Sequence, residues 1–211
     1  MEHITYSGEA SAPGKVIISG EHSAVYGHPV LLMALNRRLT CHFKCHTIST
    51  PTSFIVTAGG SVIYDSSLDQ IAKNEGRLLE YALNKFIDVP SFNLTVAVSS
   101  EIPMGAGLGS SAAYAAALSA CIALTLGKLT SQNLDCLDDL IFDFTNCMER
   151  FQHGKPSGCD AACIIKGGTI SYQLKEPPES TIVKSLGFAI DKLKVFIVYT
   201  GKQRDTKQLV S

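Results

Sequence analysis

The sequence predicts a single domain of the α+β class. Segments with a strand pattern and segments with a helix pattern follow one another without strict alternation. No stretch rich in Pro, Gly or Ser divides the chain, so we assign residues 1–211 to one domain. Hydrophobic residues make up 45% of the chain and charged residues 18%, which is typical of a globular protein with a substantial core.

The first half of the chain is predicted to form mainly strands. Strand patterns cover residues 4–10, 15–19, 39–48, 54–56, 62–64 and 92–98. We expect a turn at Pro13 and Gly14 between the first two strands, and a hairpin turn at Gly59 and Gly60. The apolar run at residues 30–35 fits either a strand or a buried helix.

The second half is predicted to be mainly helical. A capping box at residues 67–70 opens a helix that runs towards Ile87. The Ala-rich residues 112–126 predict a buried helix, because the segment is too short for a typical membrane span. Residues 131–151 carry apolar side chains at three- and four-residue spacing and predict an amphipathic helix. Two further strands are expected, at residues 169–174 and 195–199.

Charge and cysteine content exclude several classes of protein. The formal net charge is −1 with no basic run, which argues against a dedicated nucleic-acid or membrane-surface binder. The seven cysteines are odd in number and scattered, unlike a disulfide framework, and the N-terminus lacks the pattern of a secretory signal. We therefore expect a cytoplasmic protein with reduced thiols.

The sharpest motif is the glycine-rich run PMGAGLGSSAA, residues 103–113, which joins a predicted strand to a predicted helix. Its three glycines let backbone amides approach a ligand, and Ser110 and Ser111 begin a helix whose free amides favour an anion. The motif thus predicts a phosphate-binding loop; the alternative is an ordinary glycine-rich turn with a serine cap. It lacks the Lys of a Walker A loop and the spacing of a dinucleotide fingerprint.

Two further motifs place charged side chains at chain reversals. The first covers residues 11–22, SAPGKVIISGEH, and carries Lys15, Glu21 and His22. The second covers residues 153–162, HGKPSGCDAA; it carries Asp160 and follows Glu149 on the preceding helix. Polar groups at such positions can face a shared cleft. The alternatives are a surface lysine, a solvated glutamate and an aspartate that caps a helix.

Two Cys-His dipeptides, Cys41-His42 and Cys45-His46, lie on one predicted strand and suggest a metal site at first sight. Alternation along that strand, however, directs Cys41 and Cys45 to one face and His42 and His46 to the other. No further Cys/His pair follows these residues at the spacing of a zinc finger, so we expect no structural zinc here.

The three chemical motifs occur in an order that resembles the GHMP family of small-molecule kinases. Within this family, the first motif is similar to that of the members that phosphorylate mevalonate; it covers residues 12–31, APGKVIISGEHSAVYGHPVL. The resemblance covers residues 11–36, 99–124 and 148–168, and more weakly 195–210. It implies the fold of a GHMP-kinase N-terminal domain, in which a mixed sheet packs against helices.

The resemblance also implies an activity, its cofactors and its site residues. The activity is transfer of the γ-phosphate of ATP to the primary hydroxyl of mevalonate, giving 5-phosphomevalonate, with Mg²⁺. Asp160 would be the base and Lys15 its partner beside the substrate; Glu21, His22 and Thr206 would also contact the substrate; Ser111 and Glu149 would hold Mg²⁺. The nucleotide would be bound by Ser100, Gly105, Ala106, Gly107, Leu108, Gly109, Ser110 and Ser111.

General chemistry agrees with those roles. A carboxylate within reach assists a weak alcohol nucleophile, an ammonium group stabilises the developing alkoxide, and oxygen ligands suit Mg²⁺. The family further implies feedback inhibition by prenyl diphosphates at the ATP site. Separately, we expect a homodimer or other self-association. Cys159, next to the base, is expected to be an exposed thiol whose oxidation would block the site.

One part of the family pattern has no counterpart in this sequence. GHMP kinases have a C-terminal half with a third glycine-rich motif, and nothing here matches it. We therefore expect either a fragment of a longer kinase or a short form, and one alternative function is a non-catalytic or truncated inactive binding domain. A related kinase for another small alcohol is a second alternative, because the sequence does not show the shape of the pocket. We also expect the apolar helix at residues 112–126 to need cover from that second half.

Overall fold

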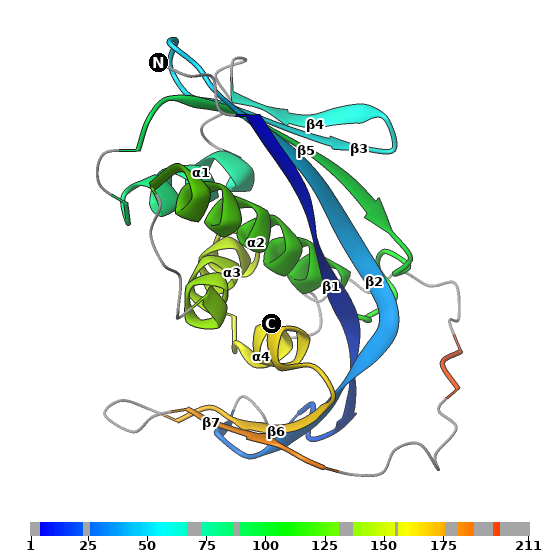
Figure 1. Cartoon of the computed structure of the whole chain (residues 1–211). Coiled ribbons are helices and arrows are strands. Elements are labelled where there is room, and N and C mark those ends of the chain that lie inside the picture. Colours follow the sequence, from blue (N-terminus) through cyan, green and yellow to red (C-terminus); the bar gives the residue numbers. More distant parts are fainter. Residues whose placement is uncertain are drawn as a thin grey trace.

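The computed structural model describes residues 5–22, 26–66, 73–86, 89–130, 137–154, 156–175, 181–187 and 196–198. Its sheet has seven strands in the order β4-β3-β5-β2-β6-β7, with β1 paired to β2 on the other edge (Figure 1). The strands are β1 (Thr5–Ser19), β2 (Val30–Thr47), β3 (Ser53–Ala58), β4 (Ser61–Asp65), β5 (Phe92–Ser100), β6 (Thr169–Gln173) and β7 (Ile182–Ser185). The β3–β5 pair is parallel and the other pairs are antiparallel, so the sheet is mixed, as the sequence predicts.

The long pair of β1 and β2 corrects two expectations. Pro13 and Gly14 do not form a turn between two strands; β1 runs straight through them, with a register shift between Pro13 and Lys15. The reason is tertiary: both halves of β1 pair with the same neighbour, β2, which holds the chain extended. The apolar run that fitted strand or helix is the first part of β2.

The alternation along β2 follows the prediction. Cys41, Phe43 and Cys45 are buried in the core, whereas His42 and His46 are exposed on the outer face of the sheet. The part of the chain that the structure describes contains no group of three or more His, Cys, Asp or Glu side chains placed to hold a metal ion.

The helices of the described residues lie on one face of the sheet (Figure 1). They are α1 (Asn74–Leu83), α2 (Ser110–Thr130), α3 (Leu137–His153) and α4 (Cys159–Lys166). The predicted capping box of α1 and the predicted start of α3 fall on residues 67–72 and 131–136, which lie outside the described residues. The β3–β4 hairpin around Gly59 and Gly60 and the strand β6 form as expected.

Helix α2 is the centre of the core, and this corrects the expectation that it needs cover from another half. Its residues from Ala112 to Leu126 are almost all buried, packed on β1 and β2 and against the other three helices. It is the one described helix long and apolar enough to span a bilayer, but most of its surface is buried within this chain. The helix also continues past Gly127, which therefore does not end it.

The strand expected at residues 195–199 is not found in its described part, residues 196–198. These residues have no regular secondary structure, and Phe196 and Val198 are 84% and 85% exposed. A strand needs a hydrogen-bonded neighbour, and none of the described strands pairs with this segment.

Candidate active site

A partly buried ion pair lies at the centre of the site. Lys15 Nζ lies 3.0 Å from Asp160 Oδ2, and their side chains are only 9% and 32% exposed. Lys15 comes from β1, whereas Asp160 lies in the first turn of α4, so elements far apart in sequence form the pair. A buried ammonium group is costly without a counter-charge, and Asp160 supplies it.

Asp160 is not the cap of its helix. The residue at the cap of α4 is Gly158, which has a left-handed backbone at φ +80°, and no side chain caps the helix there. A side chain at Gly158 would come within 2.9 Å of the Tyr172 hydroxyl. The structural alternative for Asp160 is therefore wrong, and its carboxylate is directed to Lys15.

The glycine-rich loop connects β5 to α2 and lies against the ion pair. Gly105, Gly107 and Gly109 all have positive φ, from +69° to +76°, which side chains rarely adopt. The Ala113 N–H donates to the Gly109 carbonyl at 2.9 Å, which places Gly109 at the start of α2. The backbone amides in the first turn of a helix have no acceptor within the helix itself. This is the arrangement in which a helix N-terminus binds phosphate.

Ser100 braces the start of this loop. Its hydroxyl accepts a hydrogen bond from the Ile102 N–H at 3.1 Å and lies 3.1 Å from the Ile102 carbonyl oxygen. Those contacts give Ser100 a structural role in addition to the nucleotide contact that the resemblance implies.

Glu149 on α3 completes a cluster of three charges with Lys15 and Asp160. It is 7% exposed, and its pKa is raised to about 7, first by burial and then by the negative charge of Asp160. Lys15 and a hydrogen bond from Ser111 act in the opposite direction. Two carboxylates thus share one ammonium group.

The oxygens of this cluster fit a magnesium ion. Glu149 Oε1 is buried and has no hydrogen-bond partner among the described residues, and the Ser111 hydroxyl contacts the same side chain. Carboxylate and hydroxyl oxygens are hard ligands, and Mg²⁺ usually binds through one or two carboxylates together with substrate phosphates. Such a site needs no larger cluster of protein ligands.

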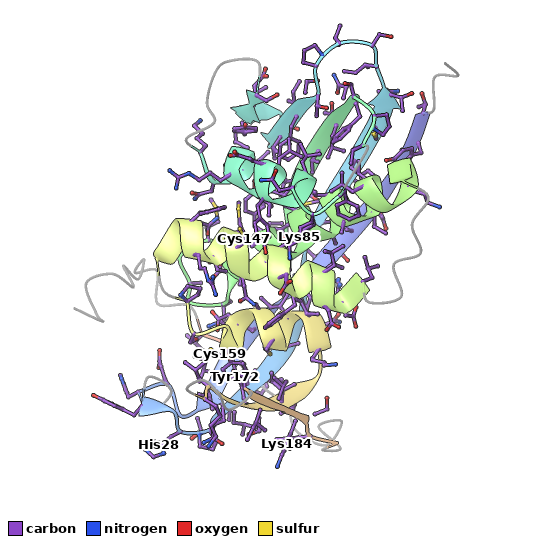
Figure 2. All side chains as sticks on the ribbon, turned by 90° about the vertical axis from the view of Figure 1, so that its left-hand side faces the viewer. His28, Lys85, Cys147, Cys159, Tyr172 and Lys184 are labelled. Atoms are coloured by element: carbon purple, nitrogen blue, oxygen red, sulfur yellow. The ribbon has the colours of Figure 1, made fainter. Side chains whose placement is uncertain are left out.

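Cys159 corrects the expectation of an exposed, oxidisable thiol. It is 6% exposed, and burial together with the charge of Asp160 raises its pKa to about 12. Its thiol accepts from the Ser157 hydroxyl at 3.1 Å and donates to Asp160 Oδ1 at 3.5 Å. Figure 2 shows Cys159 beside Tyr172, and both belong to one buried cluster with Val30 and Leu32 of β2.

Three of the predicted substrate-binding residues are not brought together with the ion pair by the described part of the structure. Glu21 and His22 are exposed in the turn that follows β1, and Thr206 lies outside the described residues. Their contacts with a substrate stay predictions. Sequence reasoning missed Ser157 and Tyr172, whose hydroxyl donates to the Ser157 carbonyl and holds the loop before Asp160. A tyrosine on a buried strand gives no signal of this in the sequence.

The sequence of this chain is similar to a known family and to several characterised kinases. Residues 72–168, which include the glycine-rich loop, Glu149 and Asp160, match the family described as GHMP kinases N terminal domain. Mevalonate kinase from Bos taurus is 29% identical over 95% of this chain and 61% of its own length. Mevalonate kinase from Thermococcus gammatolerans is 30% identical over 96% of this chain and 60% of its own length.

Solved structures show the same architecture at lower identity. L. major mevalonate kinase in complex with R-mevalonate has a TM-score of 0.64 at 22% identity, over 87% of this chain and 53% of its own. The mevalonate kinase of Methanococcus jannaschii has a TM-score of 0.65 at 22% identity, over 86% and 56%. The chain spans about 60% of the length of the curated relatives it matches. Residues 72–168 thus match the GHMP-kinase N-terminal domain family, and the fold of the chain is that of the solved mevalonate kinases.

Proposed function

We propose that this chain carries the nucleotide-binding and catalytic part of an ATP-dependent mevalonate kinase. The reaction transfers the γ-phosphate of ATP to the primary hydroxyl of mevalonate and gives 5-phosphomevalonate. The observation that carries the proposal is the partly buried Lys15–Asp160 pair, 3.0 Å apart, against a glycine-rich loop at a helix N-terminus. Similarity to relatives named mevalonate kinase over 95–96% of the chain supports mevalonate as the substrate.

Asp160 would act as the general base. As the substrate oxygen forms its bond to the γ-phosphorus, the hydroxyl proton passes to Asp160 and the bond to ADP breaks. The Lys15 ammonium group balances the carboxylate and stabilises negative charge on the attacking oxygen. Both groups are largely withdrawn from water, where such interactions are stronger than in bulk solvent.

The loop and the start of α2 would bind the phosphates of ATP. Their backbone N–H groups are the donors, and the residues involved are Ser100, Gly105, Ala106, Gly107, Leu108, Gly109, Ser110 and Ser111. Ser111 and Glu149 would hold Mg²⁺. When bound, the ion would neutralise phosphate charge during transfer.

The remaining contacts follow from the family resemblance. Glu21, His22 and Thr206 would position mevalonate beside Asp160. Prenyl diphosphates, which present a diphosphate anion like that of ATP, would compete at the loop. A cytoplasmic location and self-association complete the proposal.

The test is an ADP-release assay with mevalonate and, separately, with galactose. It is run on this chain and on the chain extended by the C-terminal part of the Thermococcus gammatolerans relative. We expect mevalonate-dependent ADP release that Asp160→Asn lowers by about two orders of magnitude or more. Binding of Mg-ATP without turnover in either form would instead indicate a non-catalytic binding domain. Turnover with another alcohol alone would indicate a related small-alcohol kinase.

A further inference from the structure

An irregular stretch of the β1–β2 pairing lies beside the candidate active site. Pro13 pairs with Arg38 of β2, but Lys15 pairs with Ala34, so Gly14 has no partner in the register and three residues of β2 are skipped. Bulges of this kind redirect backbone groups and side chains, and they are common next to active sites. Here the extra residues belong to β2, and Gly14 of β1 lies opposite them, directly before Lys15.

Both ends of the glycine-rich loop are tied to this bulge. Near the start of the loop, the Glu101 N–H donates to the Arg38 carbonyl at 2.9 Å, and the Arg38 N–H donates to the Glu101 carboxylate at 3.3 Å. Near its end, the Lys15 N–H donates to the Leu108 carbonyl at 2.9 Å. The backbone amide of Lys15 therefore holds the loop, while its side chain holds Asp160.

Two glycines make this close approach possible. A Cβ at Gly14 would lie 3.0 Å from the Leu108 carbonyl oxygen and 3.5 Å from Ile102 Cδ1. A Cβ at Gly109 would lie 2.7 Å from Lys15 Cγ. The loop backbone thus packs on Gly14 and on the Lys15 methylenes with no room for a side chain.

We propose that Gly14 is a positioning residue of the site: its lack of a side chain lets the loop settle on β1, which fixes the Lys15 ammonium group between loop and Asp160. The inference rests on the proposed kinase function for its kinetic consequence. Its structural part, the dependence of the Lys15–Leu108 hydrogen bond on Gly14, stands independently. The loop that binds phosphate and the lysine that serves the base then move as one unit.

Gly14→Ala is the test and Gly8→Ala is its matched control. Both glycines lie in β1, and an added Cβ meets its nearest neighbour at 3.0 Å in both. At Gly14 that neighbour is the backbone of the loop, whereas at Gly8 it is the ring of Phe43 in the core. We expect Gly8→Ala to lower stability and leave the kinetics unchanged.

For Gly14→Ala we expect a loop shift of a few tenths of an ångström. In the active, extended form, kcat should fall roughly tenfold and the affinity for Mg-ATP should weaken, while KM for mevalonate stays near its original value. Wild-type kinetics in Gly14→Ala, or equal kinetic losses in both variants, would overturn the proposal.

Hydrogen exchange at the Lys15 amide separates this inference from the proposed function. Gly14→Ala should speed that exchange several-fold, and Gly8→Ala should not, whether or not the protein is a kinase. If no alcohol is phosphorylated but this difference is seen, the kinase proposal fails and the positioning role stands. If Gly14→Ala does not fold, Mg-ATP added to the unaltered chain should slow exchange at Lys15, and no change there would refute the coupling.

Discussion

Replacement of Glu149 by Gln is expected to remove a pH-dependent destabilisation of the metal-free protein. In the folded chain, burial and Asp160 raise the pKa of Glu149 from 4.5 to about 7. The folded state therefore binds this proton more tightly than the unfolded state. The contribution of this proton to the free energy of unfolding is complete below about pH 4.5, where Glu149 is protonated in both states. That contribution is lost as the pH rises from about 4.5 through about 7.

The magnitude follows from the shift. One pKa unit corresponds to about 1.4 kcal/mol, so the full effect is about 3 kcal/mol, of which about 2.5 kcal/mol develops between about pH 5 and about pH 8. Glu149→Gln cannot ionise. Its free energy of unfolding, relative to that of the wild type, should therefore rise by about 2.5 kcal/mol across this interval.

Urea unfolding of the metal-free proteins at several pH values measures this difference. Asp143→Asn is the control, because Asp143 is an exposed carboxylate on the same helix, paired with Lys85 at 3.3 Å. An exposed ion pair contributes little to stability, so the control should differ little from the wild type. Added Mg²⁺ should stabilise the wild type at pH 8 and have a weaker effect on Glu149→Gln. A pH-independent stability difference for Glu149→Gln would refute the argument about burial and charge.

Three other variants or reactions test separate parts of the account. Asp160→Asn should lower turnover of the active, extended form by about two orders of magnitude or more, with little change in ATP affinity by calorimetry; near-normal turnover would remove it as the base. Phe144→Ala removes a fully buried ring packed edge-on against Tyr81 and should lower the free energy of unfolding by roughly 3–5 kcal/mol; a smaller loss would mean that the core closes over the gap. Alkylation at pH 8, followed peptide by peptide, should label half-buried Cys147 well before Cys159, and equal rates would contradict the buried thiol.

The sequence predicted correctly those features whose conformation depends on residues close by in the chain. The glycines of the loop, the serines that begin α2 and the hairpin at Gly59 and Gly60 all have the conformations that their residue types favour. The alternation of Cys41 to His46 likewise placed each side chain on the correct face of β2. Each of these features depends on neighbours a few residues away.

Long-range pairing decided the features that sequence reasoning missed. Pro13 and Gly14 carry a local signal for a turn, and only the pairing of β1 with β2 keeps the chain extended there. The apolar character of α2 shows that it must be covered, but not that strands and helices of this chain cover it. Cys159 is adjacent in sequence to a partly exposed aspartate, yet the packing of β2 and β6 buries it.

The charges of the site lead to a last expectation about the nucleotide. Asp160 and Glu149 carry two negative charges around one ammonium group, so the metal-free site is short of positive charge above the pKa of Glu149. ATP brings further negative charge and should therefore bind poorly without a divalent cation, although the loop amides favour its phosphates. Calorimetry at pH 8 should show tight binding only for Mg-ATP in the wild type, whereas Glu149→Gln should bind metal-free ATP more tightly than the wild type does. Equal affinity of the two proteins for metal-free ATP would mean that Glu149 does not face the phosphates, and that Ser111 alone of the proposed pair lies at the metal.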